Sequence, residues 1–348
     1  MATLTQTAYF TRKIIKYGGI AFVGLIIIRA GYITIKKILP PKTPAEIPPN
    51  VAFGKLPKIV FPQSSNLPQI SYRLETISGA LDKLPDQAKV YFMPEPSSSF
   101  LTTEKILTWA STIGFTQEPI KVGEFDYRFT SRLPANSELN VNAITKNFTF
   151  NYDWKNDPAG FSFQPAPEEN ISLEKAASFL RQAQSFPKDL TTANNKIVSL
   201  KNVNNTLVEV TFPEANFSKV NFYRQTDDGL KILPPDPKDA NIYLIVSSIG
   251  NSFNGVIEAK YIHNIISTEI QATYPLRDVN LAWSQLVEGN GFVANLGNNP
   301  DGNIIVRSAY LAYYEGEKQS YLQPIIVFEG DRDFTAYVPA ITSGSFTE

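Results

Sequence analysis

The sequence predicts an α+β protein with an N-terminal transmembrane helix, a proline-rich stalk, and antiparallel-sheet modules that each follow a short helix. Three observations lead to this fold class. Residues 17–35 form an uninterrupted apolar run, residues 40–68 contain eight prolines, and the rest alternates between capped helical patterns and strand-like segments. Hydrophobic residues make up 43% of the 348 residues and aromatic residues 12%, which is typical of a folded protein.

The apolar run at 17–35 reads YGGIAFVGLIIIRAGYITI and lies between pairs of lysines. As a helix it would rise roughly 28 Å, close to the hydrocarbon thickness of a bilayer. No small-x-small cleavage site precedes the basic residues that follow, so we expect a retained single-pass anchor and not a signal peptide. Residues 1–16 would then be a cytoplasmic tail. The anchor residues that we expect to contact lipid are Tyr17, Phe22, Leu25, Ile28, Arg29 and Tyr32.

Arg29 is the one charged residue within this run. An arginine at the centre of a membrane span costs about 3 kcal/mol on insertion scales. Two interpretations are open. The side chain can extend to the C-terminal interface beside Tyr32, or it can pair with an acidic group on a partner helix.

Charge is distributed unevenly along the chain. Residues 1–42 carry seven Lys and Arg and no acid, whereas the remainder carries 25 basic against 33 acidic residues. Basic residues beside a membrane are attracted to anionic headgroups, and the acidic remainder argues against nucleic acid as a partner. The chain has no cysteine, which excludes disulfides, thiolate metal sites and cysteine nucleophiles.

The proline-rich segment, residues 36–69, is expected to be a semi-rigid spacer that lifts the following domain away from the bilayer. A docking peptide for an aromatic groove is the alternative. A first α+β module is expected over residues 70–160. Its helix would begin at residues 102–105, place Ile106, Trp109 and Ile113 inward, and end at Gly114. Strands are expected at 70–81, 89–93, 124–129 and 147–154.

A second, larger α+β region is expected over residues 161–348. Ser172 is the expected N-cap of a helix that runs to about residue 185, and Asp278 is the expected N-cap of a helix that ends at Gly289. Asn254–Gly255 predicts a hairpin turn. Strands are expected at 196–200, 206–212, 219–224, 229–233, 241–249, 255–263, 267–274, 291–296, 304–314, 321–328 and 334–338.

The last module contains the segments WSQLVEGNG (283–291), FVANL (292–296), AYLAYYE (309–315) and YLQPIIVFEG (321–330). These segments resemble the C-terminal part of YycI/YycH-type regulators, whose modules are similar to PepSY domains. The resemblance implies a membrane-anchored, extracytoplasmic protein that modulates a sensor kinase in Gram-positive bacteria. Proteins of this family have one N-terminal transmembrane helix and the larger part of the chain outside the cell. The resemblance therefore favours an N-terminus inside the cell.

No catalytic, cofactor-binding or metal-binding residue can be assigned from the sequence. His263 is the only histidine, and at the end of a strand pattern it is expected to be structural. The acidic residues Glu329, Asp331 and Asp333 are expected to be solvated charges, with a weak divalent-cation site as the alternative. The sequence NNPDGN at 298–303 is expected to be a hairpin turn and not a calcium loop.

Tyrosines are concentrated in the last module. Tyr310 and Tyr314 are expected on one face of a strand and Tyr313 on the other. A face left exposed would suit a protein partner, so the candidate interface residues are Tyr310, Tyr313, Tyr314 and Tyr321. Pro324 predicts an edge strand or a bulge, since it cannot donate to a central ladder.

These observations favour a non-enzymatic, single-pass envelope protein whose extracytoplasmic domain binds another membrane or envelope protein in a regulatory or assembly role. A homo-oligomer that forms a structural or adhesion component, for example through the edge strand near Pro324, is the alternative. A carboxylate-dependent hydrolase of envelope polymer is the third hypothesis.

Overall fold

The computed structural model describes residues 4–38, 48–63, 67–96, 102–132, 136–157, 160–250, 253–316 and 319–347. The chain divides into two units, Met1–Pro48 and Pro49–Glu348. The first unit contains the helix α1 (Leu4–Ile38). The helix begins before the apolar run because residues 4–16 contain no proline or glycine, so the expected tail is helical from Leu4.

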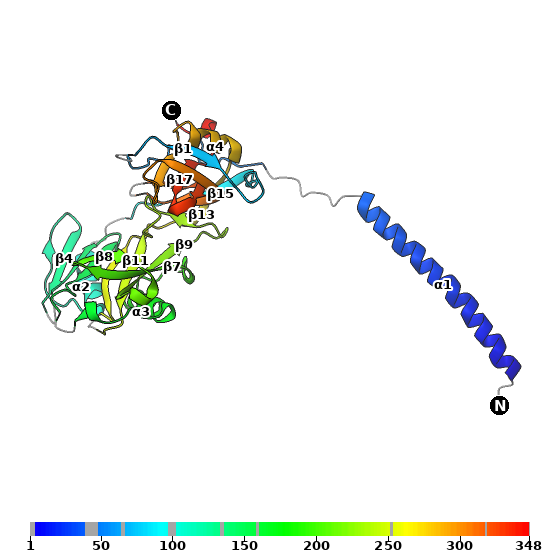
Figure 1. The fold of residues 1–348 in the computed structure, drawn as a ribbon, viewed down its shortest axis with the longest axis horizontal. Helices are drawn as coiled ribbons and strands as arrows, with labels where there is room; N and C mark the ends of the chain where they lie inside the picture. Colours follow the sequence, from blue (N-terminus) through cyan, green and yellow to red (C-terminus); the bar gives the residue numbers. More distant parts are fainter. Residues whose placement is uncertain are drawn as a thin grey trace. The chain divides into compact units, whose positions relative to one another are not determined.

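The second unit, which we call the head, is an α+β structure with mostly antiparallel sheets, as predicted (Figure 1). Its nine-stranded sheet is antiparallel throughout and has the order β3-β4-β5-β6-β12-β11-β9-β7-β8. The strands are β3 (Ile120–Lys121), β4 (Asp126–Ser131), β5 (Ser137–Asn142), β6 (Phe148–Tyr152), β7 (Leu190–Val203), β8 (Thr206–Glu209), β9 (Phe217–Arg224), β11 (Ile242–Ser247) and β12 (Val256–Tyr261). Helices α2 (Thr102–Thr112) and α3 (Glu169–Gln182) share its hydrophobic core.

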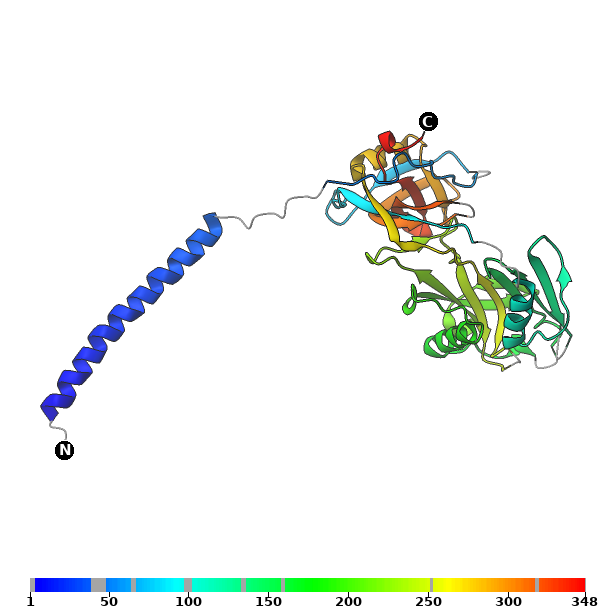
Figure 2. The ribbon, with the colours of Figure 1, turned by 180° about the vertical axis from the view of Figure 1, so that it is seen from behind.

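The other sheet has eight strands in the described residues, with β1-β15-β16-β17-β14 as its main path and β2, β10 and β13 beside it. In the ribbon seen from behind, its C-terminal strands are orange to red (Figure 2). The strands are β1 (Ser71–Leu74), β2 (Gln87–Phe92), β10 (Ile232–Leu233), β13 (Ser267–Pro275), β14 (Phe292–Asn295), β15 (Asn303–Tyr314), β16 (Tyr321–Gly330) and β17 (Thr335–Pro339). Strands β1 and β10 pair in parallel with β15. Helix α4 (Val279–Val287) packs on this sheet through Val279, Ala282 and Leu286. Short 3-10 helices are η1 (Phe161–Phe163), η2 (Phe212–Glu214), η3 (Asp331–Asp333) and η4 (Ser343–Ser345).

Local signals in the sequence have mixed outcomes. The Asp278 carboxylate accepts a hydrogen bond from the Asn280 backbone N–H, which confirms the predicted cap of α4. Asn254 and Gly255 both have positive φ at the turn between β11 and β12, which confirms the predicted hairpin. The predicted Ser172 cap is wrong, because α3 begins earlier, at Glu169. Ser172 is buried, and its hydroxyl donates to the Pro167 carbonyl.

The expected division at residue 160 does not follow the sheets. Strand β6, before residue 160, pairs with β12, after it, so both belong to the nine-stranded sheet. Strands β1 and β2, expected in the first module, pair instead with β15, β13 and β16 of the other sheet. Local patterns locate most of the strands, but they miss β3 and β5 and extend β1 beyond Leu74. They carry no information on pairing across large sequence separations.

Part of the expected stalk, residues 36–69, belongs to the head. Leu56 is fully buried, and its N–H donates to the Ser345 carbonyl at 2.8 Å. Phe53 packs against the same core, at 5.0 Å between ring centroids from Tyr321. Apolar residues between the prolines explain the difference, since their burial outweighs the preference for a solvated extended chain. The remaining stalk positions 39–47 and 64–66 lie outside the described residues.

Pro324 lies in a central strand, so the predicted edge strand or bulge is wrong. Strand β16 pairs with both β15 and β17. Opposite Pro324, Tyr313 donates its N–H away from β16 to the Lys231 carbonyl, so Pro324 has no bond to make on that side. On the other side, Pro324 lies opposite Ala340, just past β17, and its carbonyl accepts the Ala340 N–H at 3.1 Å. The Ala340 carbonyl accepts the Arg277 N–H instead, so the missing N–H of Pro324 leaves no acceptor unpaired. A self-assembling edge at Pro324 is therefore not present.

Candidate functional site

A buried cluster of charged side chains lies where the two sheets of the head meet. Arg224 at the end of β9 and Glu315 just after β15 are 2% and 1% exposed. Arg224 donates from Nη1 to Glu315 Oε1 at 2.6 Å, from Nε to Asp189 Oδ2 at 2.8 Å, and from Nη2 to the Asn264 carbonyl at 2.9 Å. The hydrogen bonds between Arg224 and the carboxylates are charge-assisted and therefore strong. The cluster ties β9 of one sheet to the end of β15 of the other.

Neighbouring groups complete the cluster. Asn241 donates from Nδ2 to Glu315 Oε2 at 2.7 Å, and His263 Nε2 lies 3.0 Å from Asp189 Oδ1. Burial alone would raise the pKa of Asp189, but the hydrogen bond with His263 and the charge of Arg224 lower this pKa to about 2. Asp189 is therefore ionised at neutral pH. Burial alone would likewise lower the pKa of Arg224, and the charges of Glu315 and Asp189 raise it instead.

His263, the only histidine, is held by its surroundings. Its backbone N–H donates to Asn147 Oδ1 at 2.9 Å, and its ring stacks on Tyr261 with centroids 6.0 Å apart. Among the described residues no hydroxyl hydrogen-bonds to this ring, so the geometry does not form a nucleophile–base pair. The arrangement agrees with the structural role expected for His263.

A cavity of about 520 Å³ opens beside the charged cluster and brings together residues from both sheets. Its volume lies in the range of small-ligand sites. We call it the bulge pocket. It is lined by Tyr91, Lys188, Asp189, Thr191, Arg224, Gln225, Thr226, Asp227, His263, Ile265, Ile266 and Thr268.

Two register shifts form the walls of the bulge pocket. In β7, residues 191–194 lie between Leu190, paired with Arg224, and Asn195, paired with Phe222, so the strand bulges away from β9. In β13, residues 268–270 separate two positions that pair with adjacent residues of β2, Phe92 and Tyr91. Bulges of this kind redirect side chains and are frequent next to functional sites. Here they contribute Thr191 and Thr268 to the pocket lining.

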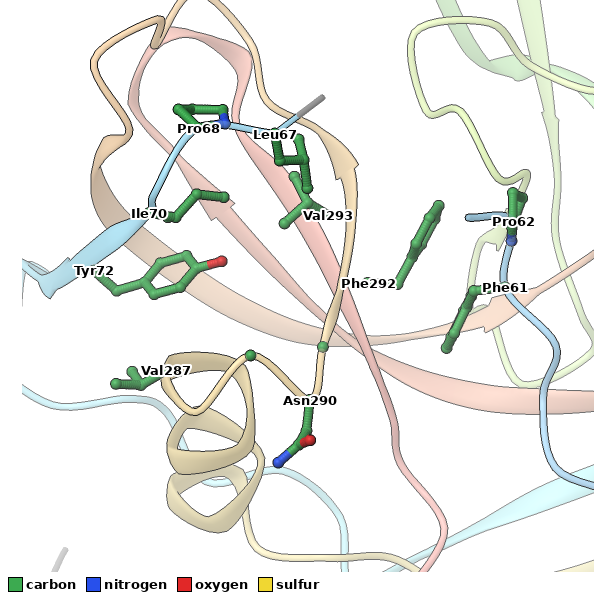
Figure 3. A pocket seen from close by; sticks show the side chains of 12 residues that line it. Phe61, Pro62, Leu67, Pro68, Ile70, Tyr72, Val287, Asn290, Phe292 and Val293 are labelled. Atoms are coloured by element: carbon green, nitrogen blue, oxygen red, sulfur yellow. The ribbon is translucent and has the colours of Figure 1, made fainter. Parts of the chain in front are cut away.

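A second cavity, of about 540 Å³, lies by the C-terminal end of α4 and strand β14 (Figure 3). Phe61 and Phe292 stack at its side with ring centroids 4.9 Å apart and planes 7° apart. Leu67, Ile70 and Val293 supply apolar lining, and Asn290 is a polar residue on its wall (Figure 3). Leu67 directly follows residues 64–66, which lie outside the described part of the chain.

The tyrosines proposed as an interface are largely covered. Tyr310 and Tyr314 belong to one hydrophobic cluster and Tyr313 to another, so the predicted division between the faces is correct. However, Tyr313 is 0% exposed and Tyr314 is 1% exposed, so neither can meet a partner at the surface. Tyr310 and Tyr321 are half-buried. The face of β15 that carries Tyr310 and Tyr314 is covered because Ile59, Phe61 and the β9 residue Tyr223 pack against it.

The acidic turn does not gather its carboxylates around one point. Asp331 accepts hydrogen bonds from Arg307 at 2.8 and 2.6 Å, while Glu329 accepts one from the Tyr310 hydroxyl at 2.8 Å. In the described residues no group of three or more His, Cys, Asp or Glu side chains is placed to hold a metal ion.

Helix α1 contains one stretch, Thr11–Thr34, that has the length and composition of a membrane span or a signal sequence. It includes all six anchor residues named from the sequence. Its large apolar side chains are exposed, Phe22 at 67% and Ile28 at 73%.

The sequence does not predict the charged cluster. Asp189, Arg224 and Glu315 are far apart along the chain, and each stands next to a strand-like stretch. The available signal is weak. Arg224 is the last residue of β9, and Glu315 directly follows the last residue of β15. Both strands are largely buried at these ends, so a charged side chain there lies close to the core.

Comparison with known proteins gives limited information. No family model matches the chain, and no curated protein does. Among solved structures, the chain is similar to the Bacillus megaterium YpeB C-terminal domain, at 14% sequence identity and a TM-score of 0.35. The match covers 73% of this chain and 96% of that domain. At this TM-score the likeness supports no functional argument.

Proposed function

We propose that this chain is a single-pass membrane protein whose α+β head lies outside the cytoplasm and binds another protein, in a regulatory or assembly role without catalysis. The observation that carries the proposal is α1, a helix with a span-length apolar stretch whose side chains are exposed. Exposed apolar surface of this extent is stabilised by lipid and destabilised by water. The seven basic residues within positions 1–42 add attraction to anionic headgroups.

The two sheets of the head are joined at their junction by the buried Arg224–Glu315 pair. We favour recognition over catalysis because the charged side chains at this junction are engaged with one another: Arg224 with Glu315 and Asp189, and Asp189 with His263.

The orientation can be tested cleanly because the chain contains no cysteine. A single thiol is introduced either before the span, by Thr5→Cys, or in the head, by Lys58→Cys at an exposed position. In intact cells a membrane-impermeant maleimide should label Lys58→Cys but should label Thr5→Cys only after permeabilisation. The reverse pattern would place the head in the cytoplasm. Release of the chain by alkaline carbonate would refute the anchor.

The partner is tested by crosslinking in intact membranes, followed by detergent extraction and purification of the full chain. The control is α1 fused to an unrelated soluble domain. We expect a discrete crosslinked species with the full chain that is absent from the control. Recovery of the full chain only as a monomer would contradict the proposed function.

A further inference from the structure

Three aromatic side chains from different strands of the eight-stranded sheet lie together in one cluster. Phe292 of β14 lies 6.0 Å from Tyr337 of β17, and Tyr337 lies 6.1 Å from Tyr314 of β15, measured between ring centroids. We call these three residues the aromatic surface. Tyr337 is 0% and Tyr314 is 1% exposed, so the aromatic surface is closed in this structure. Aromatic residues are enriched in the cores of protein–protein interfaces.

The aromatic surface is covered by a segment from the proline-rich part of the chain. The Phe61 ring lies 4.9 Å from Phe292 and 4.8 Å from Tyr314, measured between ring centroids. It lies 6.5 Å from Tyr337. Figure 3 shows the stack of Phe61 on Phe292. Ile59 packs against the same cluster.

The covering segment, residues 57–62, has the sequence PKIVFP and alternates in exposure. Ile59 and Phe61 are half-buried, whereas Val60 between them is 84% exposed. This alternation is that of an extended chain that inserts every second side chain into a surface. A proline at each end favours the extended form. Extended, proline-containing segments that dock on aromatic surfaces are a recurring mode of peptide recognition.

The covering segment is attached more weakly than the residues before it. The Leu56 N–H donates to the Ser345 carbonyl at 2.8 Å, and the Pro57 carbonyl accepts from Gln323 Nε2 at 2.9 Å. Among the described residues, no backbone N–H or carbonyl of residues 58–62 has a hydrogen-bond partner. The segment can therefore lift from the aromatic surface without the loss of a sheet pairing or a backbone hydrogen bond. Segments of this kind are among the first to open locally in a folded protein.

We propose that the aromatic surface is the docking site for an extended segment of the partner protein, with an aliphatic residue and, two positions later, an aromatic residue followed by proline. The chain's own Ile59, Phe61 and Pro62 have this pattern and already fit the surface, so they define the chemistry of the partner segment. The covering segment is an internal competitor, and the partner binds only the fraction of heads in which it has lifted. This inference rests on the proposed function, because it names the surface of the head and the chemistry of the partner that recognition would use.

The test uses a synthetic probe with the sequence of residues 57–63, PKIVFPQ, labelled with a dye at its N-terminus and amidated at its C-terminus. Its binding to the full chain in detergent is measured by fluorescence anisotropy. The double variant Ile59→Ser, Phe61→Ser removes the competitor and should bind the probe at least about tenfold more tightly than the unmodified chain. A probe with serine in place of phenylalanine should bind the double variant at least about tenfold more weakly. Phe292→Ala, added to the double variant, should weaken the unchanged probe by a similar factor.

The matched control is the double variant Ile120→Ser, Val122→Ser. It removes two apolar side chains with the same spacing, 60% and 49% exposed, and should leave the affinity equal to that of the unmodified chain. Thermal unfolding of each variant shows that the fold is retained. If Ile59→Ser, Phe61→Ser fails to fold, a probe with benzoylphenylalanine in place of phenylalanine is photo-crosslinked to the unmodified chain at millimolar concentration, and labelling of β14 or β17 supports the proposal. No binding or labelling at that concentration, or equal affinity for the serine probe, would overturn it.

Crosslinking in intact membranes separates this inference from the proposed function. The variant Ile59→Ser, Phe61→Ser should raise the yield of the crosslinked species at least about threefold, and the free probe should lower it. A crosslinked species whose yield does not change would overturn the docking site and leave the proposed function standing. No crosslinked species at all would overturn the proposed function, and the probe titration would still decide whether the aromatic surface binds such a segment. A species of twice the mass of the chain would make a second copy the occupant and would overturn a separate partner.

Discussion

The buried pair between Arg224 and Glu315 gives the sharpest prediction for stability. Replacement of Glu315 by Gln keeps the size of the side chain and removes its charge. The carboxylate accepts from Arg224 Nη1 at 2.6 Å, from Asn241 Nδ2 at 2.7 Å and from the Asn264 N–H at 3.4 Å. One amide oxygen cannot replace two carboxylate oxygens, so the new NH2 group faces a donor. Arg224 is left 2% exposed with Asp189 as its remaining anion.

The magnitude follows from this geometry. Removal of one partner from a buried ion pair costs about 3–5 kcal/mol, and the remaining charge of Asp189 favours the lower end of this range. We therefore expect Glu315→Gln to lower the free energy of unfolding by about 3 kcal/mol. The assay is guanidinium unfolding of the full chain followed by tryptophan fluorescence. All three tryptophans lie in the head, so the signal reports on the head alone.

The control is Glu174→Gln, which breaks the exposed Arg181–Glu174 pair on α3. Its side chains are 50% and 69% exposed, so we expect a loss of less than about 0.5 kcal/mol. A loss below about 1 kcal/mol for Glu315→Gln, or equal losses for both variants, would refute the reasoning. The double variant Arg224→Met, Glu315→Leu removes the two almost fully buried charges together and should be more stable than Glu315→Gln alone. Asp189 then loses Arg224, but it is 29% exposed and keeps its hydrogen bond with His263.

Three further predictions use the same unfolding assay. The pKa of Asp189 is lowered from 3.8 to about 2, so ionised Asp189 contributes about 2 kcal/mol to the free energy of unfolding above pH 4, and this contribution is lost as the pH falls through 2. Asp189→Asn should remove this part of the pH dependence of stability. The same pH dependence in the variant and the unmodified chain would contradict the prediction. Gly297 has φ +64°, and an added Cβ would meet the Arg332 carbonyl oxygen, so Gly297→Ala should cost more than about 2 kcal/mol. Gly79→Ala, with φ +76° but open space around the Cβ, should cost only about 1 kcal/mol, and equal costs would show that crowding is not the cause. Trp109→Phe removes a 2.6 Å indole bond to the carbonyl at the end of α3 and should cost about 2 kcal/mol, whereas a neutral result would mean that water replaces it.

Elements fixed by neighbouring residues could be predicted from the sequence. The Asp278 cap and the Asn254–Gly255 turn each depend on backbone geometry within a few residues, and both are present. Ser172 shows the limit of this reasoning. A serine ahead of an apolar helical pattern is a good cap, but the pattern here begins one turn earlier, and burial on α3 directs the hydroxyl to Pro167.

The candidate site could not be predicted in the same way because it is assembled across the sheets. Arg224 finds Glu315 only because β9 and the end of β15 meet, and Asp189 reaches both Arg224 and His263 only because β7 pairs with β9. No spacing in the sequence encodes these pairings. The structural role of the single histidine can be predicted from its place at a strand end, but its carboxylate partner cannot.

The tyrosine-rich strands show how local periodicity can be correct while the functional inference from it fails. The alternation correctly separates Tyr310 and Tyr314 from Tyr313. It cannot reveal that Ile59 and Phe61, from the proline-rich segment, cover one of these faces. Because both faces of β15 are largely covered, the tyrosine-rich strand offers little surface for recognition. The register shifts in β7 and β13 interrupt the regular sheets instead, and both contribute residues to the bulge pocket beside the charged cluster. Pairing across large sequence separations therefore creates this cavity, and local alternation in the sequence cannot predict it.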